Sequence, residues 1–191
     1  MSTHHHFTLE TARLIVRPLR SEDLEAVTRV LNESFGEEPD AIRREWLEWQ
    51  IASYTALARL WQPPYGDRAV TLQSDSTVIG LVGFVQSWGP FEKLPSLARR
   101  LNGPPSTLAR PEFGLYWATA EAHRGKGYAT ESASAMIDYA FNQLHVQRVV
   151  ATTDDDNLAS QRVMRKLGMS IEHNPDKEPE WFQVVGVLDH P

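Results

Sequence analysis

A short glycine-rich segment between a strand and a long helix constrains the fold of this chain more than any other feature. Residues 112–119 (EFGLYWAT) are apolar and aromatic, as is typical of a strand. Residues 127–144 repeat apolar side chains at helical spacing. The eight residues His123–Thr130, which read HRGKGYAT, connect the two patterns. The order therefore predicts that a strand passes through a tight turn into the first turn of a helix.

The connecting segment has the residue types of a phosphate or pyrophosphate cradle. Gly125 and Gly127 let the backbone turn tightly and leave its N–H groups open to a ligand. The start of a helix favours an anion, because the free N–H groups and the helix dipole both point there. Arg124 and Lys126 add formal positive charge.

Two common phosphate loops fit this segment poorly. A Walker loop needs Gly-Lys-Ser/Thr at its end, whereas Lys126 precedes Gly127 here. A dinucleotide fingerprint needs a third glycine, which is absent. Asp154 stands about 27 residues on, where that fold places a ribose-binding acid, so this alternative is weak rather than excluded.

The remaining patterns predict a mixed α/β fold. Helices are expected at residues 21–35, 40–61 and 158–167, and strands at residues 13–19, 68–73, 78–86, 147–153, 169–173 and 181–188. The unit from residue 112 to residue 153 is expected to form a parallel, right-handed strand–helix–strand crossover.

Two regions are open to more than one interpretation. Residues 87–111 hold five prolines, and we expect a long loop with one or two helical turns, either a lid or acceptor-binding loop or a surface insertion. Trp46, Trp49 and Trp61 repeat along the second helix. We expect most of them in the core rather than in an acceptor pocket.

Composition limits the class of protein. A length of 191 residues argues for one domain, at residues 11–191, after a flexible tail at residues 1–10. For His4–His6 in that tail, a polar tail or a tag remnant is favoured over a metal-binding tract. Cysteine is absent, which excludes disulfides and a thiol nucleophile and fits a cytoplasmic location. The sequence contains no run of ~18 apolar residues, so no membrane span is expected. The net charge of −6 disfavours a general nucleic-acid binder.

A second stretch narrows the choice of ligand. Residues 156–160 (DNLAS) and 163–169 (VMRKLGM) follow the strand at residues 147–153. With these residues in view, the chain resembles the GNAT acyl-CoA N-acetyltransferases, and within them the RimJ/RimL-like branch. Arg124–Ala129 is similar to the family's Arg/Gln-x-x-Gly-x-Gly/Ala loop, and residues 11–19 (TARLIVRPL) are similar to the branch's first strand.

The resemblance implies a mostly antiparallel, twisted sheet flanked by helices, in which the strands at 112–119 and 147–153 splay apart. The slot between them would take the pantetheine arm of acetyl-CoA. Asn157 would touch the pantetheine, and it is also placed as a helix N-cap. The other residues implied in cofactor binding are Trp117, Ala118 and Thr119 for the pantetheine amides and Arg124, Gly125, Lys126, Gly127, Tyr128 and Ala129 for the pyrophosphate.

Acetyl transfer to an amine needs deprotonation of the amine, donors for the oxyanion and a proton for the leaving thiolate. Without cysteine, direct attack in a ternary complex is expected. Many family members carry a tyrosine acid seven residues after the DN asparagine, but Met164 stands there. The resemblance makes Ser160 the candidate donor, with Tyr116 and Tyr128 as weaker alternatives.

The general base is less defined. Glu112 opens the central strand, where family bases are sometimes found; His123, for which packing is favoured, and bulk water are the alternatives. Asp154–Asp156 lack the glycine and glutamate of a calcium loop, so no metal is expected.

The sequence therefore predicts an N-acetyltransferase that moves an acetyl group from acetyl-CoA to a primary amine of a protein N-terminus or a small molecule. A non-catalytic acyl-CoA-binding or sensing domain is the alternative. We expect no nucleic-acid or membrane partner and leave a homodimer open. Five cations fall in or beside the two cofactor elements, and without them the chain carries −11: Arg124, Lys126, Arg162, Arg165 and Lys166.

Overall fold

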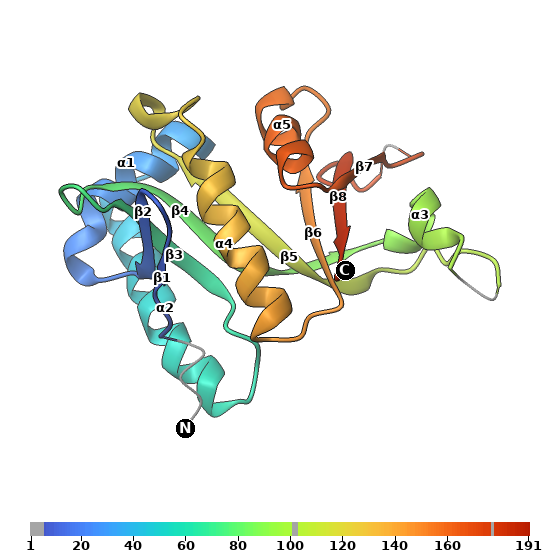
Figure 1. The fold of residues 1–191 in the computed structure, drawn as a ribbon, viewed down its shortest axis with the longest axis horizontal. Coiled ribbons are helices and arrows are strands. Elements are labelled where there is room, and N and C mark those ends of the chain that lie inside the picture. Colours follow the sequence, from blue (N-terminus) through green and yellow to red (C-terminus); the bar gives the residue numbers. More distant parts are fainter. Residues whose placement is uncertain (1–5, 101–102, 177) are drawn as a thin grey trace. The chain divides into compact units, whose positions relative to one another are not determined.

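The computed structural model describes residues 6–100, 103–176 and 178–191 (Figure 1). The chain divides into two compact units. The first comprises Met1–Val85 and Tyr116–Leu144, and the second comprises Gln86–Leu115 and His145–Pro191. Strands β4 (Val78–Gly89) and β5 (Arg110–Thr119) contribute residues to both units. The single domain expected at residues 11–191 stays a prediction.

The first unit combines antiparallel strands with three helices. Strands β1 to β4 pair in chain order, each antiparallel to the next. The 3-10 turns η2 and η4 precede α1 and the glycine-rich loop. The elements other than β4 and β5 are β1 (Leu9–Glu10), β2 (Leu14–Pro18), η2 (Ser21–Asp23), α1 (Leu24–Phe35), α2 (Asp40–Arg59), β3 (Gly66–Leu72), η4 (Glu121–His123) and α4 (Tyr128–Asn142).

The helices of this unit cover both faces of its strands. On one face, Val27 and Leu31 of α1 and Leu47 of α2 pack with Ala69 of β3 and Ala118 of β5 in one buried cluster. Figure 1 shows α4 in front of these strands and α1 and α2 behind them. The apolar residues that recur at helical spacing therefore form the buried faces of these helices.

The expected tail at residues 1–10 is wrong for the part that the structure describes. Leu9 and Glu10 form β1, which pairs with β2. The Phe7 ring is buried, stacks on Tyr139 with centroids 4.0 Å apart, and lies 4.0 Å from the guanidinium of Arg68. One aromatic side chain anchors this segment because it buries a large apolar area. Residues 1–5, and with them His4 and His5, lie outside the described residues.

The second unit contains the parallel pair. Strand β5 pairs parallel with β6 at Gly114↔Val150, while β8 pairs antiparallel with both β6 and β7. Phe91 and Phe182 meet edge to face in its apolar cluster, with ring centroids 5.0 Å apart. The further elements are η3 (Phe91–Lys93), α3 (Pro95–Ala98), β6 (Arg148–Thr153), α5 (Leu158–Lys166), β7 (Ser170–His173) and β8 (Val184–Asp189).

These elements confirm the mixed α/β class and the parallel direction of the predicted crossover. The expected loop at residues 87–111 is shorter, because β4 extends to Gly89, β5 begins at Arg110, and η3 and α3 lie between them. The core prediction for the tryptophans is wrong in two of three cases: Trp46 packs against the core, but Trp49 is 60% and Trp61 90% exposed. Trp61 lies two residues after Arg59, the last residue of α2, and so beyond the buried face of that helix.

No helix in the described part of the chain combines the length and the apolar character that crossing a membrane requires.

The close approach of β4 and β5 at Gly80 gives a test of the fold. A Cβ on Gly80 would lie 2.5 Å from the carbonyl oxygen of Ala118. We expect Gly80→Ala to lower the free energy of unfolding by about 1–3 kcal/mol in denaturant titrations, because backbone must shift to make room. Gly103→Ala is the matched control, since no described atom lies within 4 Å of its Cβ. Equal stability of the two variants would contradict the packing.

Candidate active site

The glycine-rich loop lies entirely within the first unit, between η4 and α4. Gly125 has a φ of +74° and Gly127, the residue before α4, a φ of +84°. Side chains disfavour this left-handed region, so glycine is required for the turn. A Cβ on Gly125 would meet no described atom within 4 Å, so the space over the loop is open.

The loop presents a row of free hydrogen-bond donors. Among the described residues, no acceptor takes the N–H of Gly125, Lys126 or Gly127. The first hydrogen bond into the helix runs from the Glu131 N–H to the Gly127 carbonyl. The preceding N–H groups in the first turn therefore lack intrahelical partners and favour an anion. These residues fit the pyrophosphate of a coenzyme A ester.

A side-chain clamp fixes the loop to β2. One Glu131 carboxylate oxygen lies 2.7 Å from Nε and 2.6 Å from Nη2 of Arg13, and the other accepts from the Thr11 hydroxyl at 2.6 Å and the Arg13 N–H at 2.8 Å. Arg13 Nη1 also donates to the Lys126 carbonyl at 3.1 Å, and its guanidinium lies 4.5 Å from the Tyr128 ring centroid. Burial alone would raise the pKa of Glu131, but the hydrogen bonds from Thr11 and Arg13 outweigh it and lower the pKa.

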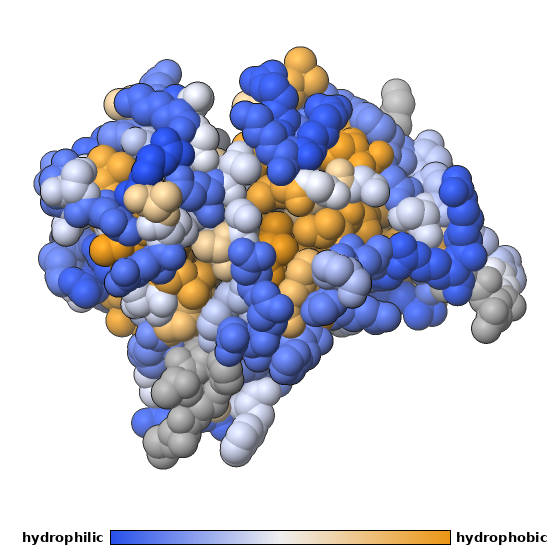
Figure 2. Space-filling model, viewed as in Figure 1, coloured by the Kyte–Doolittle hydropathy of each residue, from blue (hydrophilic) through white to orange (hydrophobic). Residues whose placement is uncertain are grey.

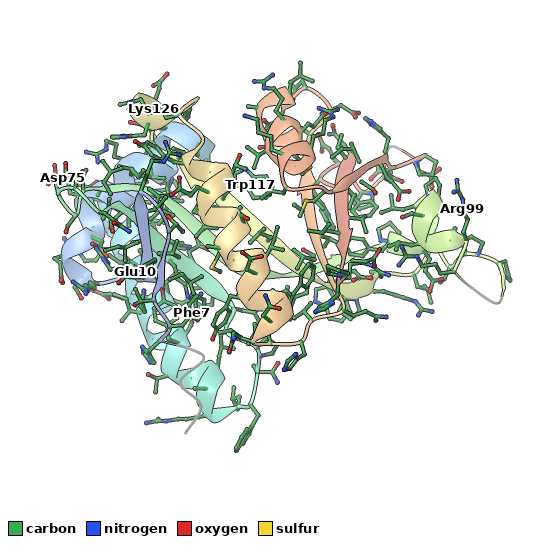
Figure 3. The ribbon with its side chains drawn as sticks, in the orientation of Figure 1. Phe7, Glu10, Asp75, Arg99, Trp117 and Lys126 are labelled. Carbon is green, nitrogen blue, oxygen red and sulfur yellow. The ribbon has the colours of Figure 1, made fainter. Side chains whose placement is uncertain are left out.

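The two cations of the loop reach neighbouring main-chain carbonyls. Arg124 donates from Nε to Thr119 at 3.0 Å and from Nη2 to Glu33 at 2.8 Å, and the Glu33 carboxylate accepts the N–H of Glu121. Lys126, labelled in Figure 3, donates from Nζ to the Ala122 carbonyl at 2.9 Å. Both charges therefore remain beside the free N–H groups without being paired to an acidic side chain in these contacts.

The residues predicted to bind pantetheine form the end of β5 in the same unit. Ala118 is buried in the core, whereas Trp117, labelled in Figure 3, and Thr119 are half-buried. The chain runs directly from these residues through η4 into the loop, so the predicted pantetheine and pyrophosphate segments are continuous.

Asn157 and Ser160 belong to the second unit, where they begin α5. The Asn157 side-chain oxygen accepts the N–H of Ser160 at 3.0 Å, which confirms the N-cap. Ser160 is half-buried. Figure 2 shows hydrophilic residues over the outer surface of α5. Met164, which replaces the tyrosine of many family members, is fully buried and packs near Gly186.

The two predicted base candidates lie in different surroundings. Glu112, in the second unit, accepts from Arg148 at 3.0 Å, and Arg148 also pairs with Asp189 at 2.9 Å. His123, in the first unit, lies with its ring centroid 6.2 Å from that of Tyr128. Its buried Nδ1 has no hydrogen-bond partner among the described residues.

The acetyltransferase (GNAT) domain family model matches residues 13–170. The chain belongs to this family. The match begins at the clamp residue Arg13 and includes every site residue predicted from the sequence.

Individual relatives of this GNAT chain span different shares of it. It is 35% identical over 83 residues to the uncharacterized N-acetyltransferase YjdG of Bacillus subtilis (strain 168), over 44% of the chain and 48% of YjdG. The matches to the first curated relatives thus span half of their length or less. It is 26% identical to the spermidine N(1)-acetyltransferase of Escherichia coli (strain K12), over 82% of the chain and 73% of that enzyme. The solved structure of the ribosomal α-N-protein acetyltransferase RimL, in complex with coenzyme A, superposes with a TM-score of 0.62 at 14% identity, covering 95% of this chain and 96% of that one.

Sequence reasoning missed the clamp and one buried acid of the GNAT domain. Arg13 and Glu131 are 118 positions apart, so no local pattern joins them. Asp67 of β3 is only 6% exposed, although its position in an otherwise ordinary strand gives no local signal. For the clamp, the sequence offers one signal: Glu131 lies in the first turn of α4, where a carboxylate interacts favourably with the helix dipole.

The clamp predicts a local loss of order when Arg13 is removed. We expect Arg13→Ala to lower the free energy of unfolding by ~1 kcal/mol, as the Glu131 carboxylate loses charged donors. Amide exchange measured by NMR should speed up at residues 124–131. Arg20→Ala is the control, because Arg20 is exposed and its ionic contact with Glu22 is 4.0 Å long. Unchanged exchange in Arg13→Ala would show that the loop is held by other contacts.

Proposed function

We propose that this chain is an acetyl-CoA-dependent N-acetyltransferase with a primary amine as acceptor. The observation that carries the proposal is the clamped loop of free N–H groups at Gly125–Gly127, in a chain of the GNAT family. A pyrophosphate supplies the anion that such a loop favours. The coenzyme A bound to RimL supports the choice of cofactor.

Each predicted segment has a role in this proposal. The backbone of Arg124–Ala129 holds the pyrophosphate, and the main chain of Trp117–Thr119 pairs with the pantetheine amides like an added strand. Asn157, besides capping α5, touches the pantetheine. When bound, acetyl-CoA supplies the activated acetyl thioester, and the protein orients it.

The proposed reaction is direct attack of the amine on the thioester in a ternary complex, since the chain has no cysteine to carry the acetyl group. Ser160 donates a proton to the leaving thiolate. Glu112 is a candidate base, but its ion pair with Arg148 ties up one carboxylate oxygen. His123 and water are the other candidates from the sequence.

Two relatives support the choice of acceptor class. One is named as a spermidine N(1)-acetyltransferase, and 73% of its length is matched. The other, RimL, is named as an acetyltransferase of the α-amino group of a ribosomal protein. A primary amine is common to both. We propose a small-molecule amine or a protein N-terminus as the acceptor.

A non-catalytic acyl-CoA-binding domain is the second candidate function, favoured by the buried Met164 at the usual position of an acid. Calorimetric titration with acetyl-CoA, followed by thiol release in the presence of spermidine, n-butylamine and an alanyl peptide, separates the two. Binding with thiol release supports the enzyme. Binding without release from any amine supports the second candidate, and no binding contradicts both.

A carboxylate in the loop tests the cofactor site. We expect Gly127→Asp to weaken acetyl-CoA binding at least ~100-fold, because its charge opposes the pyrophosphate. Gly127→Ala is the matched control, since it carries the same strain at a φ of +84° without the charge. If both variants bind acetyl-CoA equally in calorimetry, the pyrophosphate does not lie at this loop.

A second substitution tests the acid. Ser160→Ala should lower kcat by ~10- to 100-fold, the usual effect of a general acid, with the Kd for acetyl-CoA nearly unchanged. Ser170→Ala, on an exposed position of β7, is the control. Unchanged turnover in Ser160→Ala would remove this serine from the mechanism.

A further inference from the structure

Three strands of the first unit bring a carboxyl, a glycine and a phenol into one row. Asp67 of β3 pairs with Gly83 of β4. The Ala120 N–H at the end of β5 donates to the carbonyl of Ile79 near the start of β4 at 2.9 Å. A Cβ on Gly80, the next residue of β4, would lie 3.4 Å from the Cα of Thr119, the preceding residue of β5, so the two strands run antiparallel. Continuing this register by three residues places Tyr116 opposite Gly83.

The row lies on the strand face that α1 and α2 cover. Tyr116 packs against the cluster formed by these helices, and Asp67 is two residues before Ala69 of the same cluster. Alternate residues of a strand share a face. A Cβ on Gly83 would lie 2.9 Å from Asp67 Oδ1, so the carboxyl reaches over the space that this glycine leaves free.

Asp67 is a buried acid whose carboxyl forms no salt bridge with another described residue. The residue is 6% exposed, and only burial and the charge of Arg68 act on its carboxyl, with no hydrogen bond among the causes. Burial raises the pKa of Asp67 from 3.8 to about 7, although Arg68 lowers it. An acid with this pKa changes its protonation state in the range where a general base works best.

Asp67 is the group of the row that can accept a proton near neutral pH. Burial raises the pKa of Tyr116, and the charge of Asp67 raises it further against the effect of Arg43 of α2. Burial also raises the pKa of Tyr54 of α2, to about 12, and its hydroxyl donates to the main-chain carbonyl of Asp67. Both phenols therefore stay protonated at neutral pH. The glycine on β4 adds no charge, and Arg68 is the cation next to Asp67 on β3.

Two neighbouring aromatic rings, those of Phe35 and Tyr116, fit an amine that also carries an apolar group. Phe35, the last residue of α1, is exposed, and its ring centroid lies 5.9 Å from that of Tyr116. Under the proposed function, the pantetheine arm runs from the loop past Thr119 and Trp117. Its acyl end then lies beside Tyr116, the next residue along β5.

We propose that Asp67 and Tyr116 form the acceptor-amine subsite, in which Asp67 binds a primary ammonium group and takes up its proton. This inference rests on the proposed function, because the subsite is defined by its place beside the acyl end of the cofactor. It adds a base that neither the family resemblance nor any local sequence pattern indicates.

The step balances without a further reactant. The ammonium group gives one proton to the Asp67 carboxylate, and the free amine attacks the thioester carbon. The C–N bond forms and the C–S bond breaks. The nitrogen loses a second proton, which leaves on the coenzyme A thiol, and Asp67 returns its proton to water. The products are the acetamide, the thiol and one proton.

The test compares Asp67→Asn and Tyr116→Phe with the wild type and with Asp75→Asn, an exposed acid in the turn after β3. kcat/KM for spermidine, n-butylamine and an alanyl peptide is measured by thiol release from pH 5.5 to 9, and acetyl-CoA affinity by calorimetry. Asp67→Asn is expected to fold, because it removes a carboxyl whose ionisation opposes burial; thermal unfolding at pH 8 checks this.

The sign of the pH effect follows from the raised pKa. Below about pH 7 Asp67 holds its proton and cannot take another, so the wild-type kcat/KM should fall there. We expect Asp67→Asn to lose at least ~100-fold in kcat/KM at pH 8. The break in the pH profile, which is the fall of kcat/KM below about pH 7, should disappear in this variant, while its Kd for acetyl-CoA is unchanged. Tyr116→Phe should raise KM for the amine more than it lowers kcat. Asp75→Asn should match the wild type.

Several outcomes overturn the inference. An Asp67→Asn variant within threefold of the wild type at pH 8 is one. A second such outcome is a pH profile of kcat/KM that loses its break in Glu112→Gln and keeps it in Asp67→Asn. Failure of the proposed function is a separate outcome, in which the wild type releases no thiol with any amine. The ¹³C titration of the Asp67 carboxyl then decides the amine subsite alone: adding n-butylamine should lower its apparent pKa, and an unchanged titration contradicts amine binding.

Discussion

The ion pair between Arg13 and Glu131 is the contact on which the geometry of the loop depends. It joins the start of β2 to the first turn of α4, and through the Lys126 carbonyl it also holds the loop between them. A glycine turn alone would leave its N–H groups in many orientations, because glycine restricts the backbone least of all residues. The clamp removes that freedom before any ligand arrives. Preorganised donors bind an anion better than donors that must first be ordered.

The sequence predicted the elements whose signals are local. The helix at residues 127–144 and the strand at 147–153 appear with boundaries shifted by a few residues, since periodic apolar residues and a glycine turn are both short-range patterns. Strand β1 escaped prediction because two residues carry no period. The expectation that most of the three tryptophans lie in the core rests on residue type alone, whereas the position around and beyond α2 decides the exposure of Trp49 and Trp61.

The same division holds for the candidate site. The cradle is contiguous in sequence, so its glycines, cations and helix start could be recognised together. Glu112 was selected by its place at the start of a strand, but its surroundings depend on Arg148, which arrives from another strand. Asp67 becomes notable only once β3, β4 and β5 are aligned, because its carboxyl reaches over space that a glycine on the neighbouring strand leaves free. Strand register is set by the whole sheet and cannot be obtained from a strand's own residues.

The contacts of Glu33 have a mechanical consequence. Its carbonyl accepts from Arg124 and its carboxylate accepts from the Glu121 N–H, so the last turn of α1 is bonded to both sides of the turn that precedes the loop. Phe35 stands two residues further along that helix. The end of α1 and the entry to the loop therefore move as one body unless both hydrogen bonds break, and a displacement at either end is transmitted to the other.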